Sequence, residues 1–146
     1  MRKTVYIAAQ YGAATAGERA RNAARARWLA TVAHRMGLAP VYVHDAIELG
    51  VFGDDNDPEA RSAGLASATA IAASCLLFWA ADADYAGQRI CRTLAPRFSA
   101  GVNAELEAWE AAHPDRQPSK RSWTQWRSYA EAWAATNWKK LPPWPG

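Results

Sequence analysis

The stretch TVYIAA, residues 4–9, is the segment from which the fold of this chain is predicted. It is short, apolar and rich in β-branched and aromatic residues, which is the pattern of a buried β-strand. A loop of small residues follows, and residues 18–36 then carry apolar side chains at helical spacing with arginines on the other face. Gly37 stands just beyond, where a helix commonly ends. The chain is therefore predicted to begin with a strand and a helix.

The same alternation continues along the chain. The stretches APVYVH (39–44) and CLLFWA (75–80) predict a second and a third strand. Between them, Asp57 offers an N-cap and Pro58 a first helical position, so a helix is predicted over residues 58–73. Strands that alternate with helices are typical of an α/β fold with a parallel sheet. We predict a flavodoxin-like or Rossmann-like parallel sheet flanked by helices.

The chain is predicted to divide into an α/β domain over residues 1–112 and a C-terminal extension over residues 113–146. The extension begins with HPDRQPSK, which is typical of a linker, and no further strand is predicted in it. Ser122 and Gln125 can form a capping box, which predicts a helix over about residues 123–138. The aromatic side chains predicted to share one face of this helix are Trp126, Tyr129 and Trp133.

The extension holds five of the eight tryptophans, and its aromatic residues allow two interpretations. Their helical spacing favours packing, either on the sheet or across a subunit interface. Alternatively, basic residues between the tryptophans would let them stack on the bases of single-stranded nucleic acid. We favour packing and expect no nucleic-acid partner. The basic residues in question are Lys120, Arg121, Arg127, Lys139 and Lys140.

The composition argues against several classes of protein. The net charge of +3 in 146 residues does not by itself predict nucleic-acid binding. The two cysteines, Cys75 and Cys91, form no CxxC or Cys/His cluster, so no structural zinc site is predicted and Cys75 is expected to be a buried thiol. The apolar run near the N-terminus is too short for a signal peptide or a membrane span. We expect a cytoplasmic protein without a membrane partner.

In parallel α/β sheets, ligands bind where loops leave the carboxyl ends of the strands. The regions expected there are Gln10–Gly12, His44–Asp45 and Asp82–Gly101. A helix that starts after Ser99 would present free backbone N–H groups to an anion such as phosphate. Glu105, about one turn inside that helix, could face the same crevice, whereas Glu107 lies about 200° further around the helix and should face solvent.

The stretch SAGVNAEL (99–106) resembles the S-x-G-[VT]-x-x-E-[LI] motif of the nucleoside 2-deoxyribosyltransferase superfamily, which includes 2′-deoxynucleoside 5′-monophosphate N-hydrolases. VYIAAQYG (5–12) resembles the first strand and loop of that superfamily, and Asn22 with the second strand fits the same pattern. The resemblance covers roughly residues 4–112. It implies cleavage or transfer at an N-glycosidic bond without a metal or organic cofactor, in a homo-oligomer with a shared active site.

The resemblance also implies roles for individual residues. Glu105 matches the nucleophile that attacks the anomeric carbon, and Ser99 with Gly101 matches the contact to the phosphate or the 5′-hydroxyl. Asp82 or Asp84 stands where a second carboxylate would protonate the leaving base. The remaining residues implied to contact the substrate are Tyr6, Gln10, Tyr11, Gly12 and Asn103.

Each of these residues also has a simpler interpretation. Glu105 can be a first-turn glutamate that the helix dipole favours, Ser99 an N-cap, and His44 a structural histidine. Asp82 and Asp84 can cap the end of a strand. Two other functions remain open, namely a nucleotide-binding or sensing protein without catalysis, and a small interaction protein whose Trp-rich extension binds a partner. A basic loop in solvent is the favoured interpretation of Arg89, Arg92 and Arg97.

Overall fold

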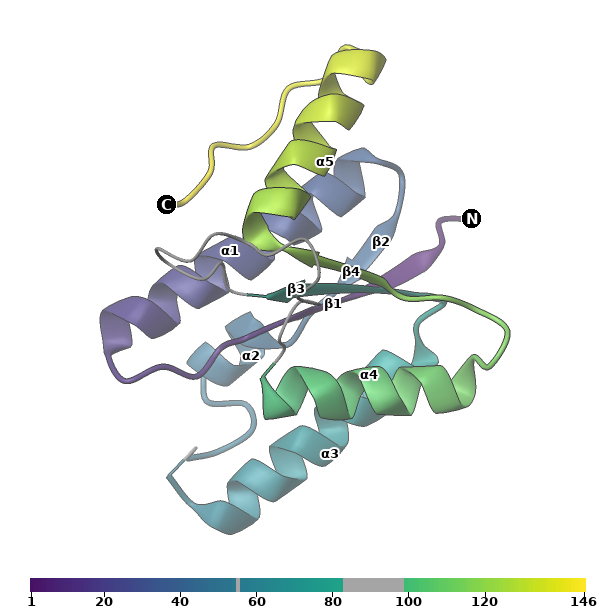
Figure 1. The fold of residues 1–146 in the computed structure, drawn as a ribbon. Coiled ribbons are helices and arrows are strands. Elements are labelled where there is room, and N and C mark those ends of the chain that lie inside the picture. The colour runs from purple at the N-terminus through teal and green to yellow at the C-terminus, as the bar shows by residue number, and fades with distance from the viewer. Residues whose placement is uncertain (55, 83–98) are drawn as a thin grey trace, which may run out of the picture.

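The computed structural model describes residues 1–54, 56–82 and 99–146, with only the backbone of Asp82. Its strands form one parallel sheet in the order β2-β1-β3-β4 (Figure 1). This order is the flavodoxin-like one, and it confirms the predicted α/β fold. The strands are β1 (Thr4–Ala9), β2 (Ala39–Val41), β3 (Leu77–Asp82) and β4 (Ser119–Ser122).

Helices cover both faces of the sheet, so the chain forms three layers (Figure 1). On one face lie α1 (Ala16–Arg35) and α5 (Trp123–Asn137), and on the other α3 (Pro58–Ser74) and α4 (Ala100–Ala112). A short helix, α2 (His44–Glu48), follows β2. The chain thus winds outward from β1 to β2 and then crosses back to β3 and β4, which places the reversal of strand order between β1 and β3.

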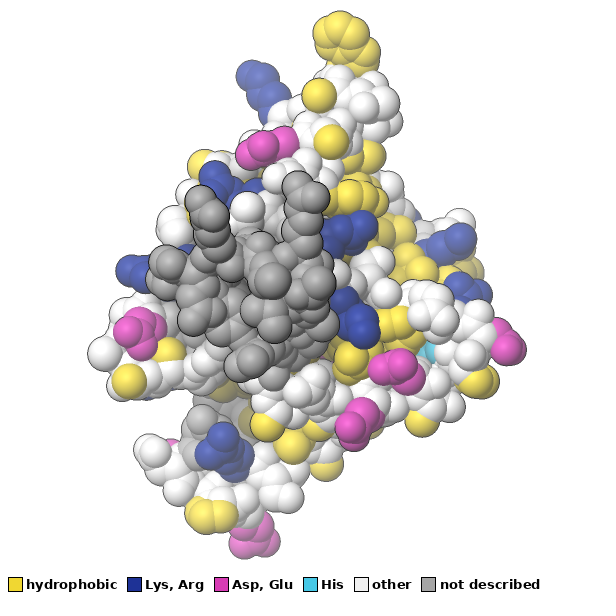
Figure 2. Space-filling view, in the orientation of Figure 1, with side chains coloured by type: hydrophobic (Ala, Val, Ile, Leu, Met, Phe, Trp, Pro, Cys, Tyr) yellow, Lys and Arg dark blue, Asp and Glu magenta, His cyan; other side chains and the backbone are white. Residues whose placement is uncertain are grey.

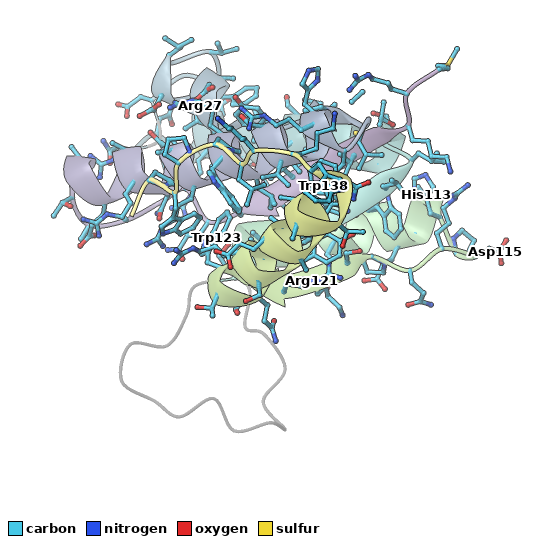
Figure 3. The ribbon with its side chains drawn as sticks, turned by 90° about the horizontal axis from the view of Figure 1, so that it is seen from above. Arg27, His113, Asp115, Arg121, Trp123 and Trp138 are labelled. Carbon is cyan, nitrogen blue, oxygen red and sulfur yellow. The ribbon has the colours of Figure 1, made fainter. Side chains whose placement is uncertain are left out.

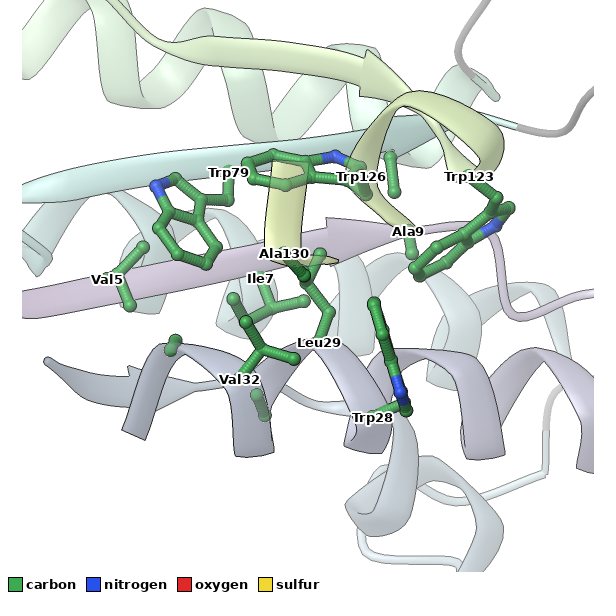
Figure 4. Packing of buried hydrophobic residues seen from close by; sticks show 13 residues of the cluster. Val5, Ile7, Ala9, Trp28, Leu29, Val32, Trp79, Trp123, Trp126 and Ala130 are labelled. Carbon is green, nitrogen blue, oxygen red and sulfur yellow. The ribbon is translucent and has the colours of Figure 1, made fainter. Parts of the chain in front are cut away.

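Alternation along β1 divides the core between the two faces. Val5 and Ile7 pack with residues of α1 and α5, whereas Tyr6 and Ala8 pack with residues of α3 and α4. Figure 4 shows the first cluster, in which indole rings from α1, β3 and α5 surround the aliphatic side chains. Because both faces are covered, every residue from Val5 to Ala9 is buried, as the continuous apolar run predicted.

Four of the helices begin at a side-chain N-cap. The Thr15, Asp57 and Ser99 side chains accept hydrogen bonds from the first turns of α1, α3 and α4. The predicted capping box of Ser122 and Gln125 is present at the start of α5. These contacts fix where four helices begin and hence where the loops at the carboxyl end of the sheet meet them.

Two predicted strands differ in extent from the observed ones. β2 ends at Val41, and His44 is the first residue of α2 rather than the end of a strand. β3 starts at Leu77 because α3 continues to Ser74 and Cys75 caps it. Cys75 is nevertheless buried, as expected.

The predicted linker HPDRQPSK (113–120) was wrong in its last two residues, which begin a strand. Ser119–Ser122 pairs in parallel with Trp79–Asp82 of β3 and extends the sheet by one strand. An edge strand does not need apolar side chains on both faces, so the polar sequence SKRS gave no strand signal. Residues 119–122 therefore complete the sheet that residues 4–82 begin, and the helix that follows them covers one face of it.

The predicted helix of the extension packs on the sheet, and its Trp123 and Trp126 are buried, as the packing interpretation expected. The indole N–H of Trp126 donates to the Ala80 carbonyl at 2.9 Å. The predicted face is only partly correct, because Tyr129 is 39% exposed and Trp133 half-buried. The buried face instead consists of Trp123, Trp126, Ala130 and Ala134. Within the described ranges, no helix has the length and apolar character needed to cross a membrane.

Candidate functional site

A cleft of about 950 Å³ opens at the carboxyl end of β1. Its walls come from the loop after β1, the start of α2, the first half of α3 and the first turns of α4. The N-terminal ends of α1, α3 and α4 lie at the same end of the sheet, where β1 ends, although α1 covers the opposite face from α3 and α4 (Figure 1). Open α/β sheets bind ligands beside the reversal of strand order, and the cleft lies next to it.

The two glutamates of α4 occupy different environments. Glu105 lines the cleft and is only 8% exposed, whereas Glu107 is exposed and does not line it. The rotation of about 100° per residue in an α-helix explains the separation. Glu105 is thus directed to the crevice and Glu107 to solvent, as predicted from their spacing.

Tyr6, which was expected to contact the substrate, is fully buried beside Glu105 and does not line the cleft. Burial raises the pKa of the Glu105 carboxyl to about 7, and the Tyr6 hydroxyl acts in the opposite direction. Burial, and then the Glu105 carboxyl, raise the pKa of Tyr6. The Tyr6 hydroxyl is buried and has no hydrogen-bond partner of normal geometry within the described part of the chain. The two groups are close enough to interact electrostatically, and the hydroxyl is free to reorient towards the carboxyl.

The loop after β1 forms one wall of the cleft and is held by hydrogen bonds. The Gln10 amide donates to the Gly12 carbonyl at 2.8 Å, and Asn22 of α1 donates to the Tyr11 carbonyl at 3.0 Å. These bonds explain why Asn22, which belongs to the sequence resemblance, lies near the cleft without lining it. Gln10, Tyr11 and Gly12 all line the cleft, as expected.

His44 fixes the end of β1 to α2. Its Nε2 lies 2.7 Å from the Ala9 carbonyl, so this nitrogen carries the proton and donates. Burial lowers the pKa of His44 and keeps the ring neutral. The buried Nδ1 has no hydrogen-bond partner among the described residues. These contacts favour the structural interpretation of His44, although the residue also lines the cleft.

The helix that begins at Ala100 brings the predicted anion contacts to the cleft. Ser99 and Gly101 both line it. The Ser99 hydroxyl accepts a hydrogen bond from the Val102 N–H at 3.3 Å and therefore acts as the N-cap. Among the described residues, no atom outside the helix lies within 4 Å of the place where a side chain on Gly101 would begin, which leaves room for a ligand to approach the backbone.

Two arginines that were not predicted also line the cleft. Arg19 of α1 and Arg61 of α3 each lie four residues after an N-cap, Thr15 and Asp57 respectively. Arg19 donates to the Ala13 carbonyl at 2.9 Å, which leaves other guanidinium N–H groups for a ligand. Asp57 was predicted as a helix start, but no sequence signal showed that Arg19 and Arg61 converge, because this depends on how α1 and α3 are placed on the sheet.

The remaining predicted residues lie elsewhere or outside the described ranges. Asn103 is exposed on α4 and is not among the residues that line the cleft. Asp82 is the last residue of β3, and its side chain is outside the description. Asp84 and the three arginines Arg89, Arg92 and Arg97 also lie outside the described residues. Among the residues that are described, no group of three or more His, Cys, Asp or Glu side chains could hold a metal ion.

Comparison with known proteins gives one match. Residues 3–114 match the model of a family described as a domain of unknown function (DUF7768). No curated protein and no solved structure matches the chain. The matched range contains all the cleft residues named above, whereas β4 and α5 follow it.

Proposed function

The chain belongs to the DUF7768 family, a domain of unknown function, and we propose that it cleaves or transfers the N-glycosidic bond of a nucleoside or nucleoside 5′-monophosphate. The observation that carries the proposal is the placement of Glu105, a buried carboxyl that lines a cleft beside Tyr6. The resemblance of residues 99–106 to the nucleoside 2-deoxyribosyltransferase motif supports the same chemistry.

In the proposed reaction, ionised Glu105 attacks the anomeric carbon of the sugar. The bond from that carbon to the base nitrogen breaks, its electron pair leaves with the base, and an acid protonates the base. Water then releases the sugar from Glu105, or a second nucleobase takes it. A pKa of about 7 keeps a large share of Glu105 ionised near neutral pH, and the positive charge that develops on the sugar increases that share.

Tyr6 acts as a positioning residue in this proposal. When Glu105 is ionised, the Tyr6 hydroxyl can donate to the carboxylate and hold one oxygen, which leaves the other oxygen for the sugar. The effect of Tyr6 on the pKa of Glu105 supports this role, because a donor favours the charged form.

The arginines support a phosphorylated substrate. Arg19 and Arg61 line the cleft together with the N-terminal backbone of α4, and all three favour an anion. A nucleoside 5′-monophosphate would place its phosphate near these groups and its anomeric carbon near Glu105. Asp82, at the carboxyl end of β3, stays our candidate for the acid that protonates the base, together with Asp84.

We further propose a cytoplasmic homo-oligomer in which a neighbouring copy completes the cleft. Exposed apolar side chains just after α2 and on α3 support an interface beside the cleft. These side chains are Leu49 (82% exposed), Val51 (67%) and Leu65 (42%), and Leu65 itself lines the cleft.

A chromatographic assay tests the proposal. The purified chain is incubated with a panel of ribo- and deoxyribonucleosides and their 5′-monophosphates, and the products are examined for free base. A second set contains a different free nucleobase, so that a new nucleoside reveals transfer rather than hydrolysis. Ligand binding without any release of base would contradict catalysis and support the sensing function instead.

A further inference from the structure

The segment after α5 returns to the body of the protein and lies against α1 and α5. The Trp28 indole N–H donates to the Pro142 carbonyl at 3.0 Å. Arg35 donates to the Lys140 carbonyl, and Arg25 donates twice to the Gly146 carbonyl, at 2.8 and 3.1 Å. In Figure 3 the yellow C-terminal trace passes across α1.

The ring of Trp144 occupies a groove that we call the α1–α5 groove, formed by Arg25 and Trp28 of α1 and Trp123 and Arg127 of α5. Trp144 meets Trp28 edge to face, with ring centroids 5.0 Å apart, and Trp123 at 5.6 Å. The guanidinium groups of Arg25 and Arg127 lie 5.4 and 4.9 Å from the Trp144 ring. The Trp144 side chain thus has aromatic contacts and cation–π contacts from both helices.

The connection between α5 and this segment is under strain. Trp138 has a φ of 55°, and no other non-glycine residue among those described has a positive φ. Its side chain is 96% exposed, and Figure 2 shows hydrophobic atoms projecting at the end of α5. A large apolar ring in a left-handed, uncovered position is unfavourable on both counts.

We propose that the α1–α5 groove is a binding site for a proline–tryptophan segment and that it accepts residues 141–146 of a second copy in exchange for its own. The groove has the features with which proteins bind proline-rich segments, namely aromatic walls and an indole N–H directed at a carbonyl of the segment. Prolines at positions 142, 143 and 145 limit the freedom that such a segment loses on binding.

A second copy offers the identical segment, so every contact made within one chain can also be made between two chains. Opening of the connection releases the strained backbone of Trp138. The exposed Trp138 ring also gives this connection an apolar surface that a second copy can cover. The strain and the exposure of Trp138 are therefore the reason to assign the second occupant to another copy of this chain. The inference does not depend on the proposed enzymatic function, because Trp123, Arg127 and Trp144 lie outside the cleft.

A peptide experiment tests the groove. In the Trp144→Ala chain the ring site is vacant, and a fluorescent peptide with the sequence of residues 139–146 serves as the probe. We expect saturable binding that is at least tenfold tighter than that of the same peptide with alanine in place of tryptophan. We also expect weaker binding to the wild-type chain, whose own segment competes. Equal binding of the two peptides, or no binding to a folded Trp144→Ala chain, would overturn the proposal.

Self-association provides a second test that does not depend on a core substitution. Trp138→Gly changes an exposed position and suits the positive φ, so it removes both the strain and the exposed ring while the fold is retained. We expect sedimentation to show wild-type dimerisation that is weakened at least tenfold in Trp138→Gly and also in Trp144→Ala. Wild-type association that both substitutions leave unchanged, or a wild-type chain that stays monomeric at every concentration, would contradict exchange.

Discussion

Tyr6 of β1 is buried beside Glu105 of α4, which lines the cleft, and each changes the pKa of the other. The two residues are far apart in the sequence and are brought together because Tyr6 points to the face of the sheet that α4 covers. A carboxyl with a raised pKa in a cleft, next to a hydroxyl that has no aligned hydrogen-bond partner among the described residues, is a typical arrangement of a reactive site.

The buried carboxyl predicts how stability depends on pH. Burial raises the pKa of Glu105 from 4.5 to about 7, so the folded chain holds a proton that the unfolded chain has already lost between these values. Glu105 therefore lowers the free energy of unfolding as the pH rises through this range, by an amount on the order of 3 kcal/mol. Denaturant unfolding of the wild type and Glu105→Gln at pH 4 to 8 should show curves that diverge with rising pH. Parallel curves would show that the pKa is not raised.

Removal of the Tyr6 hydroxyl should affect activity more than stability. Tyr6→Phe removes a group that makes no aligned hydrogen bond within the described part of the chain, so we expect the free energy of unfolding to stay within about 1 kcal/mol of the wild type. The loss of a hydrogen bond to the ionised carboxylate should reduce kcat by roughly ten- to a hundredfold. In Tyr6→Phe the acidic limb of the pH–rate profile should also shift to higher pH, because the Tyr6 hydroxyl lowers the pKa of Glu105 in the wild type. An unchanged profile would remove Tyr6 from the mechanism.

The proposed contact of Ser99 with the ligand can be tested separately from its role as the N-cap of α4. Ser99→Ala and Ser122→Ala each remove an N-cap hydrogen bond, of α4 and α5 respectively, and each should cost about 1 kcal/mol of unfolding free energy. Only Ser99 lines the cleft, so only Ser99→Ala should also weaken substrate binding, as measured by calorimetry. If both substitutions leave binding intact, Ser99 is a cap and nothing more.

Because Arg19 and Arg61 line the cleft, we expect the chain to prefer phosphorylated substrates. Arg61→Ala should weaken binding of a nucleoside 5′-monophosphate about tenfold and leave the unphosphorylated nucleoside unaffected, because one charge-assisted contact is lost. Arg116→Ala is the matched control, since Arg116 is exposed and does not line the cleft. Equal losses for both ligands would place the phosphate elsewhere.

Local signals predicted most of the α/β fold. The buried run of β1, the N-caps Asp57 and Ser99 and the box of Ser122 with Gln125 each depend on neighbouring residues only, and all of them were recognisable. β4 was missed because its place in the sheet depends on pairing with β3, and its polar residues carry no apolar pattern.

The parts of the site that depend on helix geometry and on the order of strands and helices were predicted from the sequence. The directions of Glu105 and Glu107 followed from helix geometry, and the loop after β1 followed from the parallel sheet. Arg19 and Arg61 could not be found in this way, because their convergence depends on how α1 and α3 are placed across the sheet. The site of Trp144 could not be predicted either, because the groove that holds its ring is formed by tertiary packing of α1 and α5.

The central claim is that Glu105 is the reacting group, and a pair of neighbouring glutamates tests it most directly. Release of free base from nucleosides and their 5′-monophosphates is measured for the wild type, Glu105→Gln and Glu107→Gln, with folding of each verified by circular dichroism. Glu107 is the matched control, because it lies on the same helix and is exposed. We predict release by the wild type and by Glu107→Gln, and a loss of at least a thousandfold in Glu105→Gln, the scale typical of a lost catalytic carboxylate. Release that persists in Glu105→Gln, or no release by the folded wild type from any substrate, would contradict the account.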